Sequence, residues 1–163
     1  MDTYVIVLRL LHVTGGALWA GTALASVFFI QPSARAVGEP GEEFMRHLMG
    51  KTRLPAFMGA SAVATVVSGV LLYWHDFGAI VPFNRPMLGY AIGAVAAITA
   101  WLVGLTVMLP SGRRMEELGG RASRGEDVGA AIAVTTARMS RYDRTASWLM
   151  ILAVALMATA RYL

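Results

Sequence analysis

Four long apolar stretches, separated by polar segments, dominate the pattern of the chain. The first runs from about residue 4 to 30 and includes 21 consecutive residues, Leu10–Ile30, without a Lys, Arg, Asp or Glu. About 20 such residues, rising 1.5 Å each, are enough to cross roughly 30 Å of hydrocarbon. The other stretches cover about 54–76, 87–109 and 145–163. The pattern predicts an all-α membrane protein, a bundle of four transmembrane helices that forms a single domain over residues 1–163.

The polar connections predict how this bundle is oriented. Residues 31–53 and 110–144 together carry eleven of the fourteen Lys and Arg residues. Basic connections stay on the cytoplasmic side of a membrane. We therefore expect a bacterial inner membrane protein with both termini, and the short loop from Asp76 to Pro86, on the periplasmic or outer side. Helical spacing at 44–49 and 128–139 predicts interfacial helices within the cytoplasmic connections.

Composition narrows the classes of partner and chemistry. Hydrophobic residues make up 56% of the chain and charged residues only 15%, which indicates that the main partner is the lipid bilayer. The net charge of +4 does not indicate nucleic-acid binding, because the basic residues lie between apolar spans. The chain has no cysteine, which excludes disulfides, thiolate metal sites and cysteine nucleophiles. Its start lacks the basic segment of a signal peptide, so the first span is expected to be retained.

A short repeated string links the first and third spans. Pro32-Ser33-Ala34-Arg35 and Pro110-Ser111-Gly112-Arg113 follow these spans at an offset of 78 residues. Each string leads into a basic connection and another span. This predicts two helical hairpins of the same orientation, duplicated in parallel about an axis along the membrane normal. The alternative is that Pro-Ser before Arg is simply a common cytoplasmic helix exit.

Ionisable residues within or beside the spans are candidates for a site, because placing a charge in hydrocarbon costs about 2.5–3.5 kcal/mol. Arg9 and His12 share one face of the first span, with His12 about 12 Å inside the outer boundary. His75 and Asp76 follow the second span, Arg85 precedes the third, and Arg161 lies near the end of the fourth. These residues predict a polar cluster in the outer half of the bundle.

An imidazole inside an apolar bundle, with arginines nearer the surface, is the combination that a b-type haem requires. His12 would supply the axial nitrogen to iron, and Arg9 and Arg161 would lie near the propionates. Gly69 and Ser68 on the second span and Gly93 on the third lie near the depth of His12 and would leave room for the macrocycle. The same small residues also allow membrane helices to pack closely without a cofactor, and both interpretations stay open.

A second axial ligand is harder to find. His75 is the other histidine on the outer side, but it lies roughly 10 Å shallower than His12 if both helices stand upright. It is either the second metal ligand or an ordinary interfacial histidine. Tyr90 falls opposite His12 when the two hairpins are superposed. It either donates a hydrogen bond into the same cavity or is an interfacial tyrosine.

Other catalytic signatures are missing from the sequence. It contains no HExxH, P-loop or GxSxG motif, and the interior of the predicted spans holds no acidic residue that could form a proton relay. The ten methionines form no copper-binding cluster within a span and are interpreted as packing residues. We therefore expect no independent catalytic activity.

The first span resembles a known type of membrane helix. The string Leu11-His12-Val13-Thr14-Gly15-Gly16-Ala17-Leu18-Trp19-Ala20-Gly21, followed by a proline-basic exit, resembles small bacterial four-helix proteins of the copper-resistance protein D and DUF2269-type families. Its Leu-His…Trp-x-Gly core is similar to the first helix of HemJ-type membrane haem proteins. That similarity implies that His12 is a haem ligand. The third span lacks the lysine expected of the HemJ-type oxidase, so oxidase activity is not implied.

Three functional hypotheses follow. The first is an integral membrane protein that binds haem b, with its iron held by His12, and serves electron transfer or haem handling. The second is a cofactor-free accessory subunit that packs against other membrane subunits or a second copy of itself. The third, suggested by the copper-resistance resemblance, is a copper-related membrane protein.

Overall fold

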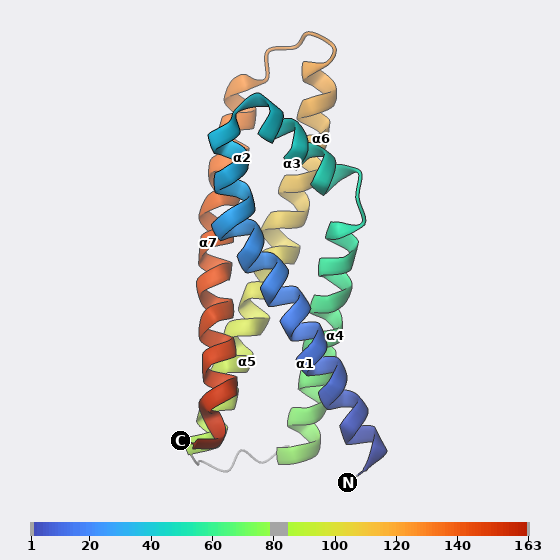
Figure 1. Cartoon of the computed structure of the whole chain (residues 1–163), viewed down its shortest axis with the longest axis vertical. Helices are drawn as coiled ribbons and strands as arrows, with labels where there is room; N and C mark the ends of the chain where they lie inside the picture. Colours follow the sequence, from blue (N-terminus) through green and yellow to red (C-terminus); the bar gives the residue numbers. More distant parts are fainter. Residues whose placement is uncertain (1, 79–84, 163) are drawn as a thin grey trace.

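The computed structural model describes residues 2–78 and 85–162, and every element in these ranges is helical. Figure 1 shows them as a tall bundle. Three of the elements are short: two are π-helical segments and one is a terminal 3₁₀ turn. In chain order the elements are α1 (Thr3–Ala25), η1 (Ser26–Ile30), α2 (Gln31–Val37), α3 (Glu39–Gly50), α4 (Leu54–Phe77), α5 (Arg85–Val103), η2 (Gly104–Met108), α6 (Leu109–Ala122), α7 (Gly129–Thr159) and η3 (Ala160–Tyr162).

Four continuous helices are long and apolar enough to cross a membrane, which confirms the predicted all-α bundle of four spans. They cover Thr3–Val37, Leu54–Phe77, Pro86–Ala122 and Gly129–Tyr162. The first and third run upward in Figure 1, and the second and fourth run downward. Both chain ends therefore lie at one end of the bundle, which we call the termini end. The opposite end, with α3 and the α6–α7 connection, is the loop end.

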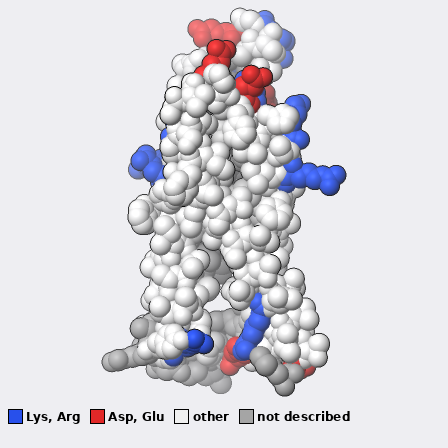
Figure 2. All heavy atoms as spheres, in the orientation of Figure 1, with Lys and Arg blue, Asp and Glu red and all other residues white. Residues whose placement is uncertain are grey.

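The outer surface of the bundle is apolar. Phe29, Val95 and Trp148 expose 71%, 65% and 63% of their surface. In Figure 2, charged residues gather toward the two ends, and Lys and Arg side chains project sideways from both edges at a similar height. Apolar faces that point outward fit a lipid solvent rather than water. The chain is a multi-pass membrane protein.

Two helices continue where the sequence predicted that they would end. Pro32 and Pro110 lie in the first turns of α2 and α6, which follow directly from the π-helical segments η1 and η2. A proline inside a regular α-helix lacks an N–H donor and clashes with the carbonyl four residues earlier. The wider turn of a π-helical segment relaxes that ladder just before the ring. The chain thus passes each proline without leaving the helix.

The two π-helical segments repeat at the same spacing as the prolines. Ser26–Ile30 and Gly104–Met108 are offset by 78 residues. The close helix contacts repeat as well: a Cβ built on Gly15 would lie 3.2 Å from the backbone oxygen of Ser61, and one on Gly93 would lie 3.3 Å from that of Ala153. Helix α1 therefore packs on α4 as α5 packs on α7. The spacing favours two like-oriented hairpins over the alternative of a common exit motif.

The two helix pairs meet in the middle of the bundle. Trp19, Ala20, Ala62, Ala100 and Met150 form a buried cluster to which α1, α4, α5 and α7 all contribute. Toward the termini end the pairs diverge (Figure 1), and the surface is hollowed between them in the space-filling view (Figure 2). The first pair, α1 and α4, carries His12, the predicted haem ligand.

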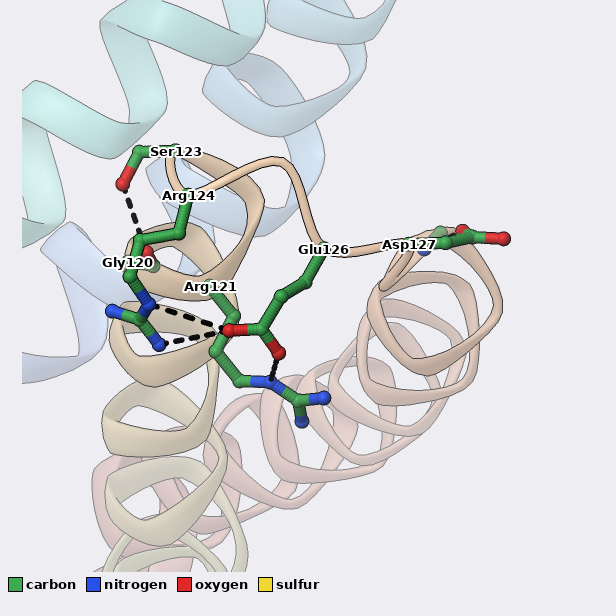
Figure 3. Close-up of polar contacts among 7 residues, drawn as sticks. Gly120, Arg121, Ser123, Arg124, Glu126 and Asp127 are labelled. Atoms are coloured by element: carbon green, nitrogen blue, oxygen red, sulfur yellow. Dashed lines mark hydrogen bonds and ion pairs between the residues drawn. The ribbon is translucent and has the colours of Figure 1, made fainter.

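The loop end is closed by two tight connections. Helix α3, predicted from the spacing at 44–49, turns back on α2 at Gly38, whose φ of +76° favours glycine. A Cβ on Gly41 would lie 1.9 Å from the carbonyl oxygen of Ala34, so this corner requires glycine. Between α6 and α7, Arg121 and Arg124 both bind the carboxylate of Glu126, at 2.6 and 3.1 Å (Figure 3).

Candidate functional site

The half-buried imidazole of His12 bridges α1 and α4. Its Nδ1 lies 2.9 Å from the carbonyl oxygen of Thr65. A carbonyl oxygen can only accept, so Nδ1 carries the hydrogen in this contact. In the neutral imidazole the other nitrogen, Nε2, then keeps its lone pair. The arrangement fixes one tautomer of His12 and leaves one nitrogen able to accept a hydrogen bond or bind a metal.

The ring of His12 rests on Gly69, one turn along α4 from Thr65. A Cβ on Gly69 would lie 2.7 Å from Cε1 and 2.9 Å from Nδ1 of the imidazole, which is closer than packed atoms tolerate. A second close approach holds the two helices together one turn deeper, where a Cβ on Gly15 would lie 2.8 Å from Oγ1 of Thr65. The predicted proximity of His12 and Gly69 is therefore a direct contact.

A polar cluster lies nearer the termini end of the same pair. The Asp76 carboxylate is 3.7 Å from the Arg9 guanidinium and 3.0 Å from Nδ1 of His75. The Tyr4 ring lies 6.4 Å from the His75 ring. All of these side chains are partly exposed to solvent. Three members of the predicted outer cluster, Arg9, His75 and Asp76, thus come together, whereas the side chain of Arg85 lies outside the described residues.

His12, on α1, and His75, on α4, lie at different levels of this helix pair. His75 follows Gly69 by six residues, or about 9 Å along the helix axis. Within the described part of the chain, the contacts of His75 are with Asp76 and Tyr4, whereas His12 contacts Thr65 and Gly69. The assignment of His75 as a second metal ligand stays a prediction.

Tyr90 and Arg161 lie on the other helix pair. The Tyr90 ring is 6.5 Å from that of Phe77, and the exposed Arg161 guanidinium lies 4.6 Å over the ring of Tyr162 and donates to its hydroxyl. The repeat makes Tyr90 the counterpart of His12. The glycine contacts pair Ser61 with Ala153, an offset of 92, which makes Arg161 the counterpart of Gly69. The second pair therefore lacks both the imidazole and the glycine against which the imidazole packs.

No family model, curated protein or solved structure matches this chain. Among the described residues, no three His, Asp or Glu side chains form a group that could hold a metal ion by themselves. A metal at His12 would need most of its ligands from another molecule, as iron receives four nitrogens from a porphyrin.

Sequence reasoning missed one group of residues, at the loop end. Gln31 donates to the Asp143 carboxylate at 2.9 Å, and Arg35 donates to Ser140 at 2.7 Å and to Gln31 at 3.2 Å. This cluster joins α2 to α7. Hydropathy assigns Asp143 to a connection, because the fourth apolar stretch begins only at Thr145. The polar residue that directly follows the first apolar stretch, Gln31, was the available signal.

Proposed function

We propose that this chain is an integral membrane haem b protein that serves electron transfer or haem handling, with His12 as an axial ligand of the iron. The observation that carries the proposal is the hydrogen bond from His12 Nδ1 to the Thr65 carbonyl. Metal-binding histidines typically donate their second ring nitrogen to such an acceptor, which fixes the ring and raises its basicity. Here that bond leaves Nε2 as the ligand.

The surroundings of His12 fit this role. Gly69 gives the ring a seat without bulk, and the helix pairs diverge toward the termini end, where the surface is hollowed. Arg9 lies one turn from His12 on the same helix, at the polar end, where a cation would pair with a propionate. When bound, the haem would supply one-electron redox chemistry at iron. The protein would orient it and set its potential through the ligand and the apolar surroundings.

The proposal extends to the membrane and the orientation. The basic connections support a cytoplasmic loop end, and the termini end, with Arg9 and His75, would then face the periplasm of a bacterial inner membrane. A haem beside His12 would lie in the outer half of the bundle. It would exchange electrons or haem with a partner on that side.

The test is an absorption spectrum of the detergent-purified protein, with and without added ferric haem. We expect a Soret band in the unaltered chain and its loss or marked shift in His12→Ala. The matched control is His47→Ala, since His47 lies on α3 at the loop end. His75→Ala tests the second ligand: if His75 binds iron, the spectrum should change from a six-coordinate to a five-coordinate form.

Two outcomes would overturn the proposal. Failure of the unaltered, folded protein to bind haem would leave the His12 to Thr65 hydrogen bond as a helix-packing contact, as expected for the cofactor-free subunit. A Soret band that survives His12→Ala unchanged would move the iron elsewhere.

A further inference from the structure

A surface pocket with two arginines lies on α7 near the loop end. Ala137, Arg138, Arg141 and Tyr142 line it, and its volume is about 380 Å³. Residues three and four positions apart on a helix share a face, so both guanidinium groups and the Tyr142 ring border the same space. Three N–H or O–H donor groups thus border one open pocket on the surface of α7.

The charge of this pocket is not neutralised by the protein. In the described ranges, the carboxylates in ion pairs contact Arg9, His75, Arg121 and Arg124, and none is paired with Arg138 or Arg141. The nearest acid along the helix, Asp143, points to α2 and accepts from Gln31. The pocket therefore presents two positive charges to an outside molecule.

The position of the pocket indicates which molecule this is. Arg141 lies one turn before the fourth apolar stretch, close to the level at which Gln31 ends the first apolar stretch and contacts Asp143. The same face of α7 continues into the spanning segment through Trp148 and Leu152, which are 63% and 44% exposed. A basic pocket at the boundary is thus continuous with an apolar strip.

We infer that this pocket binds the phosphate of an anionic membrane phospholipid. Guanidinium groups form paired hydrogen bonds with phosphate oxygens, and the Tyr142 hydroxyl adds a third donor. The acyl chains lie along Trp148 and Leu152. The apolar strip favours a lipid over a soluble phosphate, which would gain nothing from it. This inference does not depend on haem binding.

The experiment measures quenching of tryptophan fluorescence by brominated lipids in mixed micelles, because Trp148 lies on the apolar strip along which the acyl chains would run. Brominated phosphatidylglycerol is compared with brominated phosphatidylcholine. We expect tighter binding of phosphatidylglycerol to the unaltered chain and a loss of tenfold or more in the double variant Arg138→Gln/Arg141→Gln, with phosphatidylcholine unchanged. The control is Arg113→Gln/Arg114→Gln, two exposed arginines of α6 outside the pocket, which should change binding less than twofold.

Several results would overturn the inference. These are equal losses in the two double variants, no loss in the first, or displacement of the lipid by millimolar inorganic phosphate, which would assign the pocket to a free anion. Should the first variant fail to fold, the salt dependence of the unaltered chain decides. Raising the ionic strength should weaken phosphatidylglycerol binding, and an affinity that does not change with salt would contradict the proposal.

Discussion

The contact between His12 and α4 depends on two positions, Thr65 and Gly69, neither of which uses a side chain to bind the imidazole. Thr65 contributes its backbone carbonyl, and Gly69 contributes the absence of a side chain. The hydroxyl of Thr65 is used elsewhere, as a donor to the Ser61 carbonyl at 2.7 Å. The imidazole is thus held by the backbone of α4. Adding even one carbon atom to Gly69 would displace the ring.

Gly69→Ala should disturb the His12 ring and destabilise the fold. The new Cβ would lie 2.7 Å from Cε1 of His12, and added volume in a packed site costs about 1–3 kcal/mol. The measurement is the unfolding midpoint in detergent, together with haem affinity. Gly59→Ala on the same helix is the control, because nothing lies within 4 Å of its Cβ position. Equal stability of the two variants would contradict the close packing of the His12 ring on Gly69.

At this scale the sequence predicts which side chains matter better than it predicts their partners. Counting residues inward from the outer boundary placed Gly69 near the depth of His12, and the structure brings them into contact. The Thr65 carbonyl could not be predicted, since every residue has a carbonyl and the sequence does not mark the one that lies opposite a ring. Tyr90 on α5 and Arg161 in η3 lie apart from the other predicted site residues, because both belong to the second helix pair.

The π-helical segments η1 and η2 explain why the predicted helix ends at Pro32 and Pro110 were wrong. Proline normally stops a helix, but a π-helical segment precedes each of these prolines. Such a segment has no strong signature in amino-acid composition, so hydropathy and proline position alone misplace the ends. The extra helical turns contribute to packing, because they bring Gln31 and Arg35 of α2 into contact with α7.

The Gln31–Asp143 hydrogen bond should show measurable coupling between α2 and α7. In a double-mutant cycle with Gln31→Ala and Asp143→Ala, we expect a coupling energy of about 0.6 kcal/mol and at most about 1.7 kcal/mol, as for hydrogen bonds between membrane helices. The measurement is unfolding in detergent and denaturant. Asp143→Asn keeps an acceptor oxygen and should retain most of the stability, whereas purely additive effects would contradict the contact.

The α6–α7 connection should respond to acid. The hydrogen bond from Arg121, together with that from Arg124, lowers the pKa of Glu126 below its ordinary value. Because the folded pKa is the lower one, the contribution of Glu126 to stability is present above the unfolded pKa and is lost as the pH falls through the folded pKa. The carboxylate is exposed, so the effect on stability should be small.

A carboxylate NMR titration of Glu126 checks this directly. The midpoint should lie below the ordinary value for glutamate and should rise in Arg121→Gln. Arg138→Gln, on a different part of the loop end, should leave it unchanged. A midpoint at or above the ordinary value in the unaltered chain would mean that the two ion pairs are not formed in solution.

For the whole molecule, hydropathy alone predicted the four spans, because a lipid solvent imposes a length and a composition that few other structures share. The repeat was also visible, although only as one string of four residues. Its structural form, with paired π-helical segments and paired glycine contacts, could not be predicted, because the fourth helix carries no sequence string that matches the second.

The repeat has a consequence for how the protein meets other molecules within the plane of the membrane. A bundle of two identical hairpins would present the same surface on opposite sides, and a partner could approach from either. Here one pair carries His12 and Gly69, and the corresponding positions of the other carry Tyr90 and Arg161. The two lateral sides of the bundle therefore differ in their chemistry, although their helices are arranged alike. Under the proposed function, a partner that diffuses within the membrane would reach the haem site only when it approaches the α1–α4 pair. An approach to the α5–α7 pair would bring it to a similar helix surface without that site.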